Sequence, residues 1–485
     1  MSHAHDLFLD HASTTPAHPD VVGLMLPYFG NHFGIPSPFT NLGIKARDAL
    51  EEARLRVAAL LGAKPDEIVF TSGATEANNL AVLGAASAGR GRGRHLVVSA
   101  VEHSSVLNVF RHLETRGFEV SRIDVDDSGR IDPARVREAL RDDTILVSVQ
   151  HANHETGVIQ PVEEIGAMAR EKGVLFHCDA VQSAGRVHLD MNALQADLAS
   201  LSSHKIYGPK GVGALYIRTG TGIDPAMFGS GQERGLRPGT QNVACIAGFG
   251  LACSIALRDM ESNSVLVTSL RESLEQQVTT HITGVRVNGS GAARLPHISS
   301  ISFKGTRADA LAAHLDALGI VVSPRSRSGE LSPALTALDL DPEYAPGTLR
   351  VSLGWENKER QVRRTVEVLE KAVARVRAFA RASRDHDVTV FTFPDRKDAA
   401  EAIKRLEESD TAFSLVPRPT ELMHGSCSAT ALACLSSDQA EVGAILGEAG
   451  IALAGMHKNR PPEHPMHRKA RDFWDKVEQI RKRGR

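Results

Sequence analysis

The feature that most constrains the fold is a repeated alternation of short apolar runs with helical patterns between residues 66 and 217. The runs DEIVFTSG, HLVVSA and TILVSVQ are rich in β-branched residues, and each is followed by turn residues and then by a helical pattern. A fourth run, VLFHCDA, comes after the third helical segment. Strands that alternate with helices form a mainly parallel sheet covered on both faces. The pattern predicts an α/β fold, in which ligands bind beyond the carboxyl ends of the strands.

The pattern changes after residue 255. A long charged helical stretch is followed by the strand-like runs HISSISFKG and GTLRVSLG with helices between them, which predicts a second, smaller α+β lobe. A charged helix over 359–385 closes that lobe. A new strand, helix, strand pattern begins at DVTVFTFP and is followed by a loop and another helix, SDQAEVGAILGEAG. We therefore expect an enzyme domain at 1–384, a small appended α/β domain at 385–457 and a basic helical tail at 458–485.

Composition and charge exclude several classes of partner. The 56 basic and 58 acidic residues give a net charge of −2, so no overall field favours nucleic acid or an anionic membrane. The longest apolar stretch, at 243–257, is shorter than the ~20 residues that cross a bilayer and predicts a buried helix. The first residues lack the pattern of a secretory signal. Five cysteines do not make a disulfide framework, and we expect a cytoplasmic protein.

Three chemical features point to one cofactor. Lys205 follows an apolar strand and precedes a Gly-rich turn, and Asp179 and Gln182 follow another strand. The segment TSGATEANNL at 71–80 runs from a strand into a helix, whose N-terminal N–H groups can hold a phosphate. Taken singly, these features also fit a surface lysine and an ordinary helix cap. Together, a lysine for a Schiff base, a carboxylate for a ring nitrogen and a phosphate site match pyridoxal 5'-phosphate.

Long motifs along residues 6–380 carry a family resemblance. In order, they are FLDHASTTP, VFTSGATEANNLAV, EHSSVL, HCDAVQSAG, SSHKIYGPKGVGALYIR, GSGQERGLRPGTQN and LRVSLGWEN. With them the chain resembles the class V aminotransferases, and within these the cysteine desulfurases of the NifS and IscS kind. The resemblance implies the type I fold of pyridoxal-phosphate enzymes and a homodimer.

The resemblance also implies roles for individual residues. Lys205 would hold the cofactor as a Schiff base and move the Cα proton, and His103 would stack on the ring as a second catalytic residue. Arg350 would clamp the substrate carboxylate, a task suited to a guanidinium group. The other implied cofactor contacts are Asp179 at the ring nitrogen, Gln182 at the ring oxygen, and Ala74, Thr75, Ser202, His204 and a second subunit's Thr240 at the phosphate.

The chain departs from the family at two places. His154 takes the place of an asparagine that contacts the cofactor in the family. The segment VSPRSRSGELSP at 322–333 is shorter than the family loop and lacks its cysteine, which attacks the substrate sulfur. Ser328 lies nearest that position, but a hydroxyl cannot carry sulfur as a persulfide. We expect Arg325 or Arg327 to face the active site and favour a thiolate there.

Residues 386–457 resemble the DUF3343 family, which is associated with sulfur and selenium carriage. Cys427 lies there in a Gly-Ser-Cys-Ser segment, either as the missing nucleophile or as an inert surface thiol. Cysteine is among the most buried residue types, so we expect packing roles for the other four cysteines. They are Cys178, Cys245, Cys253 and Cys434.

Three functional hypotheses follow. The first is a desulfurase that converts L-cysteine to L-alanine and passes the sulfur to Cys427, and from there to an acceptor protein or small molecule that the sequence does not identify. The second is a lyase acting on L-cysteine or L-selenocysteine without a protein persulfide. The third is a catalytically silent scaffold in sulfur transfer.

Overall fold

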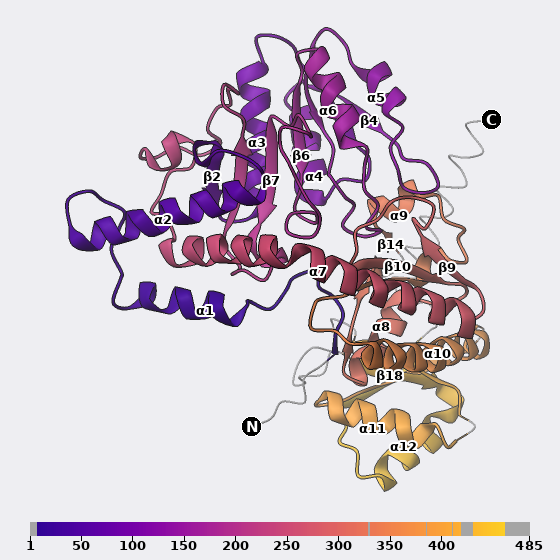
Figure 1. The fold of residues 1–485 in the computed structure, drawn as a ribbon. Helices are drawn as coiled ribbons and strands as arrows, with labels where there is room; N and C mark the ends of the chain where they lie inside the picture. The colour runs from indigo at the N-terminus through magenta and orange to yellow at the C-terminus, as the bar shows by residue number, and fades with distance from the viewer. Residues whose placement is uncertain (1–6, 328–329, 385, 410, 419–429, 461–485) are drawn as a thin grey trace. The chain divides into compact units, whose positions relative to one another are not determined.

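The computed structural model describes residues 7–327, 330–384, 386–409, 411–418 and 430–460, leaving aside the side chains of 326, 327, 330, 459 and 460. The chain folds into two compact units. The colour in Figure 1 follows the residue number along the chain. The large unit holds His11–Thr268 and Gly289–Ile298. The small unit holds the described residues up to Asp10, Ser269–Asn288 and the described residues from Ser299 onward.

A seven-stranded sheet forms the centre of the large unit, with the strand order β2-β8-β7-β6-β5-β3-β4. Strands β3 to β7 pair in parallel, and β8 runs antiparallel to both of its neighbours. This confirms the predicted α/β fold with a mainly parallel sheet. The strands are β2 (Ile68–Thr71), β3 (His95–Ser99), β4 (Glu119–Ile123), β5 (Thr144–Ser148), β6 (Leu175–Asp179), β7 (Leu198–Ser202) and β8 (Gly213–Ile217).

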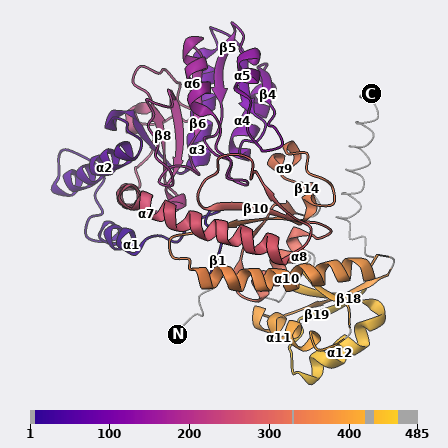
Figure 2. The same cartoon turned by 45° about the vertical axis from the view of Figure 1, so that its right-hand side comes forward.

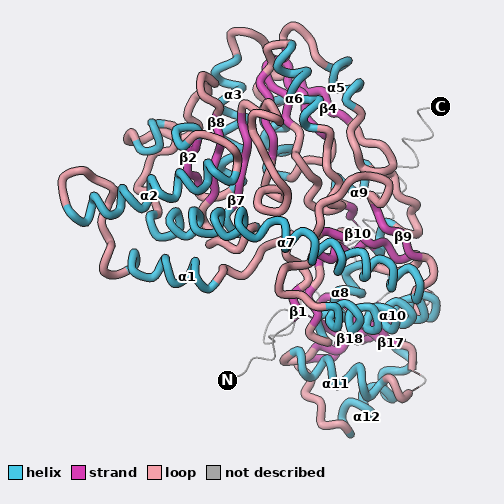
Figure 3. Tube along the Cα trace, viewed as in Figure 1, coloured by secondary structure: helices cyan, strands magenta, loops and turns pink. Residues whose placement is uncertain are grey.

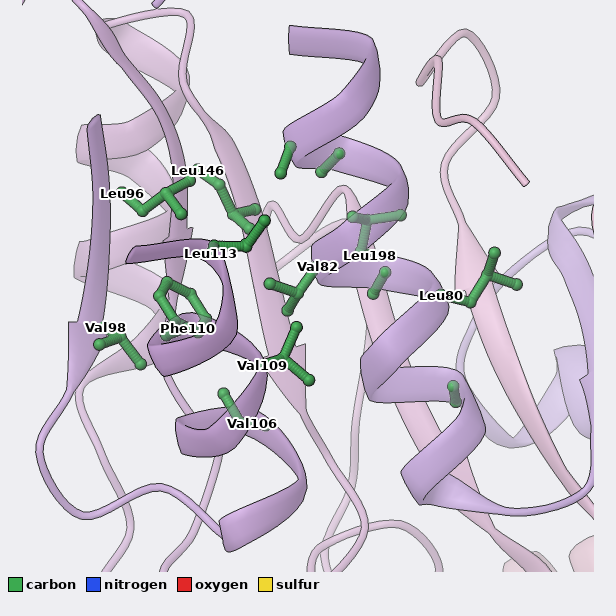
Figure 4. Packing of buried hydrophobic residues seen from close by; sticks show 14 of the residues in the cluster. Leu80, Val82, Leu96, Val98, Val106, Val109, Phe110, Leu113, Leu146 and Leu198 are labelled. Carbon is green, nitrogen blue, oxygen red and sulfur yellow. The ribbon is translucent and has the colours of Figure 1, made fainter. Parts of the chain in front are cut away.

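Helices cover both faces of this sheet because successive strand residues point to opposite sides. On one face, α3 (Ala74–Gly89) and α4 (Ser104–Glu114) bury a cluster in which Phe110 packs with strand residues such as Leu96, as Figure 4 shows. On the other face, Gly166 of α6 (Val162–Glu171) lies against Phe176 of β6. Burying a leucine or phenylalanine side chain completely stabilises the fold by roughly 1.5–3 kcal/mol.

The remaining helices of the large unit are α1 (Pro19–Met25), α2 (Asn41–Leu60), α5 (Pro133–Ala139) and the first part of α7. Helix α7 runs unbroken over Val243–His281, whereas the sequence predicted an apolar helix ending near 257 and a separate charged one. No glycine or proline interrupts residues 251–281, so nothing ends the helix there. Its length and apolar composition would suffice for a membrane span, but half of the apolar window is buried in the protein, as in a core helix.

The small unit contains the predicted α+β lobe, with a four-stranded sheet in the order β12-β15-β10-β9. The predicted strands are present as β10 (Ile298–Phe303) and β15 (Thr348–Ser352), and the predicted charged helix as α10 (Glu359–Ala382). Strand β1 (Leu7–Phe8) pairs in parallel with β11 (Ile320–Val321). The other elements are β9 (Val285–Asn288), β12 (Ser323–Pro324), α8 (Ala308–Ala317) and α9 (Pro333–Ala337).

Residues 388–460 form an antiparallel sheet of their own within the small unit, in the order β17-β18-β16-β19. Figure 2 shows it beside helices α11 and α12, and Figure 3 separates its strands and helices by colour. The sequence predicted β16, α11, β17 and α12 but missed β18 and β19. Their bounds are β16 (Val388–Thr392), α11 (Arg396–Leu406), β17 (Phe413–Pro417), β18 (Thr430–Leu435), α12 (Gln439–Glu448) and β19 (Gly455–Arg460).

The core of this C-terminal sheet is shared with the preceding lobe. Ala313 and Ala317 of α8 belong to the same buried cluster as Phe391 and Phe393, and α8 and α10 both contact β17. The boundary predicted near residue 384 stays a prediction. What the structure adds is a packed joint between α8 and the C-terminal sheet.

The segment at 322–333 is more regular than the loop expected from its sequence. Ser323 of β12 pairs with Arg350 of β15, and β13 (Ser326–Arg327) pairs with β14 (Glu330–Leu331). The Arg325 guanidinium donates hydrogen bonds to Ser323 Oγ and, at 3.2 Å, to the carbonyl of Pro324. The side chain of Arg327 lies outside the described residues, so an active-site role for Arg325 or Arg327 stays a prediction.

Candidate active site

Several of the predicted residues gather at the carboxyl ends of the strands of the large unit. Asp179 is the last residue of β6, and Lys205 ends the short 3-10 helix Ser203–Lys205 that directly follows β7. Helices α3 and α4 begin just after β2 and β3. The strand ends therefore bring the predicted lysine, carboxylate and helix N-terminus to one edge of the sheet.

Two backbone carbonyls of the N-terminal segment hold the lysine. Lys205 Nζ donates to the carbonyl oxygens of Ala12 and Ser13, both at 2.7 Å. Gln182 Nε2 donates to the Ala12 carbonyl at 3.0 Å, so Gln182 and Lys205 meet at the same acceptor. The motif FLDHASTTP was noticed in the sequence without a role for these residues, because a backbone carbonyl leaves no signal in the side-chain pattern.

Asp179 is a buried carboxylate, 7% exposed, with two hydrogen-bond donors. It accepts from Asn78 Nδ2 at 2.9 Å and from the backbone N–H of Val181 at 3.0 Å. Glu102 is buried nearby, and burial, followed by the charge of Asp179, raises the pKa of Glu102 well above its usual range. With two donors already directed at it, the Asp179 carboxylate is placed to accept a further hydrogen bond from a protonated ring nitrogen.

Two imidazoles lie together beside this carboxylate. The rings of His103 and His154 are edge to face, with centroids 5.2 Å apart, and His154 Nε2 lies 3.5 Å from Glu155 Oε1. The pKa of His103 is lowered to about 4, first by loss of water around the ring and then by His154 and Lys205, against the opposing charges of Asp179 and Glu155. His103 is therefore neutral at neutral pH. His154, which stands where the family has an asparagine, thus contacts His103.

The N-terminus of α3 has the features of an anion site. Its N-cap, Gly73, has a φ of +152° and makes no side-chain cap, which leaves the first N–H groups, at Ala74 and Thr75, without a capping side chain. The backbone is crowded there, because a Cβ on Gly213 would come within 2.8 Å of the Gly73 Cα. Thr75 and His103 line the same cavity, of about 340 Å³.

Ser202 and His204 lie on the chain that leads to Lys205. Ser202 is buried at the end of β7, and His204 Nδ1 lies 3.0 Å from Thr14 Oγ1. Burial, followed by Lys205 and Lys210, lowers the pKa of His204 to about 4. A neutral imidazole can donate a hydrogen bond to phosphate oxygens. The anion site, the carboxylate and the lysine thus fit the chemical demands of pyridoxal phosphate.

Three further residues were predicted to act at the site. Arg350, on β15 of the small unit, is only 2% exposed and forms an ion pair with Asp10, Nη2 to Oδ1 2.7 Å. Thr240 is exposed just before α7, and its expected role in a second subunit stays a prediction. Cys427 lies outside the described residues.

The four described cysteines are poor candidates for a nucleophile. Cys178, Cys253 and Cys434 are buried, as predicted, whereas Cys245 is partly exposed. Burial raises the pKa of all four thiols, that of Cys434 to about 12. A raised thiol pKa lowers the thiolate fraction at neutral pH.

Sequence reasoning also missed Asn78 and Ser105, which join the predicted residues by hydrogen bonds. Asn78 Nδ2 lies 2.9 Å from Ser105 Oγ, and Ser105 Oγ lies 2.8 Å from His103 Nδ1. Both residues lie in the first two turns of helices that start at the carboxyl edge of the sheet. That position was the signal that could have found them.

Comparison with known proteins places the chain in a family. The model for aminotransferase class-V matches residues 7–365. Cysteine desulfurase IscS of Dictyoglomus turgidum is 41% identical over 379 residues, or 77% of this chain and 96% of that protein. Cysteine desulfurase IscS of Anaeromyxobacter sp. (strain Fw109-5) is 44% identical over 376 residues, or 76% of this chain and 93% of that protein.

Solved structures agree with these sequence matches. A structure described as a NifS-like protein superposes with a TM-score of 0.72 at 34% identity, covering 76% of this chain and 99% of that one. A structure described as SspA in complex with cysteine has a TM-score of 0.64 at 34% identity, covering 72% of this chain and 99% of that one. The chain is therefore an enzyme of the class V aminotransferase family, related to the cysteine desulfurases of the IscS and NifS kind.

Proposed function

We propose that the protein is a pyridoxal-phosphate-dependent cysteine desulfurase that converts L-cysteine to L-alanine and passes the sulfur to Cys427. The observation that carries the proposal is the convergence of Lys205, Asp179 and the uncapped N-terminus of α3 at one edge of the large-unit sheet. The identity to proteins named cysteine desulfurase, 41 and 44%, supports the choice of reaction.

Each residue of the cluster has a proposed task. Asp179 would accept a hydrogen bond from the ring nitrogen, Gln182 would donate to the ring oxygen, and Lys205 would attach the cofactor and move the Cα proton. The phosphate would be held by Ala74, Thr75, Ser202, His204 and a second subunit's Thr240. When bound, pyridoxal phosphate supplies an electron sink that stabilises negative charge at the substrate Cα. Arg350, oriented by its ion pair with Asp10, would hold the substrate carboxylate.

The desulfuration step requires a thiolate. In the proposed step, the Cys427 thiolate attacks the sulfur of cysteine, so that an S–S bond forms, the Cβ–S bond breaks and its electron pair stays with the substrate carbon. A proton delivered to Cβ then completes L-alanine. The raised thiol pKa values of the four described cysteines support Cys427, because each disfavours a thiolate elsewhere. Fusion to the enzyme gives a tethered thiol a high effective concentration, about mM for short flexible linkers.

A homodimer is part of the proposal. Large apolar side chains of the segment between α1 and α2 are exposed in the single chain, which supports a covering partner. They are Leu26, Phe29, Phe33, Ile35 and Phe39. Sedimentation of the purified protein measures its mass directly, and a monomer at micromolar concentration would remove this part of the proposal.

The test is mass spectrometry of the protein after incubation with L-cysteine, together with measurement of L-alanine. The parent is expected to gain one sulfur atom on the peptide that contains Cys427, and Cys427→Ser to lose that mass. Cys245→Ser is the matched control, because Cys245 is the described cysteine that is partly exposed. Cys434 serves less well, since a serine buried in β18 would also disturb the sheet.

Each of the other outcomes selects another function. L-Alanine formed at the parent rate by Cys427→Ser, with no protein-bound sulfur and with the sulfur released as elemental sulfur, or as sulfide when a thiol reductant is added, would replace the proposal by a lyase. The raised pKa values of the described thiols favour that alternative as well, and L-selenocysteine is the second substrate to test. If the parent protein with bound cofactor forms no L-alanine, the catalytically silent scaffold is the function that remains.

A further inference from the structure

A chain of hydrogen bonds connects Asp179, the buried carboxylate of the candidate active site, to the imidazole of His103. Asn78 Nδ2 lies 2.9 Å from Asp179 Oδ2 and also 2.9 Å from Ser105 Oγ. Ser105 in turn approaches His103 Nδ1 twice, with its Oγ at 2.8 Å and its backbone nitrogen at 3.1 Å. Four side chains from β6, α3 and α4 and the N-cap of α4 are thus joined in one line.

The direction of each hydrogen bond follows from the groups themselves. A carboxylate only accepts, so it sets the orientation of the Asn78 amide, whose two N–H hydrogens then point to Asp179 and Ser105. Among the described residues, the buried Oδ1 of Asn78 has no hydrogen-bond partner. An unsatisfied buried oxygen is costly, which indicates that Asp179, and not the amide oxygen, decides the orientation of this side chain.

The donors and acceptors around His103 determine which of its ring nitrogens carries the hydrogen. Ser105 Oγ accepts from Asn78 and keeps its hydrogen, which it can donate to His103 Nδ1 if that nitrogen carries none. The backbone N–H of Ser105 can only donate, and it too points to Nδ1. Nδ1 therefore carries no hydrogen, and a neutral imidazole must then carry it on Nε2.

We propose that Asn78 and Ser105 are positioning residues that hold His103 as the neutral tautomer with its hydrogen on Nε2. In this state His103 offers a donor from Nε2 to whatever lies against its free edge and takes up no proton there. Proton removal from the substrate is then left to Lys205. This consequence for the reaction rests on the proposed function, whereas the tautomer does not.

The surroundings of His103 agree with a neutral ring. Loss of water around the ring is the largest influence, and His154 and Lys205 also oppose a positive charge on it. Together they outweigh Asp179 and Glu155, which favour one, and lower the pKa of His103 to about 4. A hydrogen on Nδ1 would in addition face the backbone N–H of Ser105, which can only donate, and the hydrogen bond from that N–H would be lost. The hydrogen bonds and the surroundings of the ring thus both favour the neutral form of His103.

The experiment is nitrogen NMR of protein labelled with ¹⁵N-histidine, with and without pyridoxal phosphate, as a function of pH. The His103 signals are assigned by their loss in His103→Asn. The parent is expected to show an unprotonated Nδ1 and a protonated Nε2 at neutral pH. Ser105→Ala should raise the titration midpoint of His103 by about half to one pH unit, the size of one lost hydrogen bond.

Ser104→Ala is the matched control, because Ser104 is the neighbouring hydroxyl in the same turn and is exposed. Asn78→Ala, which leaves the Ser105 hydroxyl in place but removes the amide that orients it, should weaken the preference for the Nε2–H tautomer, which the backbone N–H of Ser105 still favours. A protonated Nδ1 in the parent, or equal midpoints in Ser105→Ala and Ser104→Ala, would overturn the proposal. The tautomer is read without turnover, so a protein that fails to desulfurate L-cysteine but shows the expected signals refutes only the proposed function.

Discussion

The candidate active site of the large unit and the joint between α8 and β17 in the small unit both contain imidazoles with lowered pKa values, but the surroundings of these rings differ. In the pocket, His103 and His204 have pKa values lowered to about 4 and lie among Lys205, Asp179 and uncapped backbone N–H groups. At the joint, His314 has a pKa lowered to about 3, and its Nε2 accepts the backbone N–H of Leu415 at 2.9 Å. A low imidazole pKa therefore marks loss of water around the ring, and only the charged groups and hydrogen-bond donors beside the ring mark chemistry.

Other contacts at the joint are structural as well. The guanidinium of Arg375 on α10 pairs with Glu407 at 3.0 Å and lies 4.6 Å over the ring of Phe413. Apolar residues of α8 complete the shared core. The comparison predicts that changes in the pocket remove activity and spare stability, whereas changes at the joint do the reverse.

The largest expected effect is that of Lys205→Ala. The variant should lose covalent attachment of pyridoxal phosphate and lose L-alanine formation by at least about a thousandfold, because it lacks both the attachment point and the proton carrier. Its denaturation midpoint should stay near that of the parent. The measurements are cofactor absorbance, L-alanine formation and chemical denaturation.

Lys210→Ala is the control for Lys205, since Lys210 is exposed in the Gly-rich turn that follows. It should keep parent absorbance and rate. A Lys205→Ala protein that still attached the cofactor through another lysine would show that the pocket has been assigned to the wrong residue.

The next largest effect is expected for a substitution at the joint between α8 and β17. His314→Ala leaves the buried N–H of Leu415 without its acceptor, so we expect the free energy of unfolding to fall by about 1–3 kcal/mol while cofactor absorbance is unchanged. His281→Ala, on the exposed end of α7, is the control and should change stability by no more than about 0.5 kcal/mol. Equal losses in the two variants would mean that His314 is not an anchor of the joint.

The smallest effect is a pH dependence. The folded pKa of His314, about 3, lies below the ordinary value of 6.5, so the unfolded chain binds the proton more readily. Its contribution is therefore complete above about pH 6.5 and is lost as the pH falls from there toward 3. His314→Gln can still accept from Leu415 but does not titrate. Between pH 7.5 and 5.5 the parent should lose about 1 kcal/mol more stability than His314→Gln in denaturation experiments.

Much of the pocket could be predicted from sequence because its residues follow from strand ends. The β-branched runs fixed where β6 and β7 stop, and Asp179 and Lys205 come at or just after those stops. The turn and helix after β2 likewise placed Ala74 and Thr75 at a helix N-terminus. Local pattern and the parallel arrangement were enough for these residues.

The remainder depends on contacts that no local pattern encodes. The carbonyls of Ala12 and Ser13 reach Lys205 across about 190 residues, and Asn78 and Ser105 resemble ordinary polar residues in the first turns of helices. Strand β18 was missed because half of its residues are alanine or cysteine, in a run too mixed to read as a strand. The unbroken helix α7 was divided in two because its apolar face gives way to a charged one.

The pairing of β1 with β11 has a consequence for the order in which the protein is made. Leu7 and Phe8 find their partners only at Ile320 and Val321, and Asp10 finds Arg350. At about 5–20 residues per second, a ribosome needs roughly 15 to 70 seconds to supply those partners. Leu7 and Phe8 are thus secured only after residues about 310 positions later have been made, and Asp10 waits for Arg350.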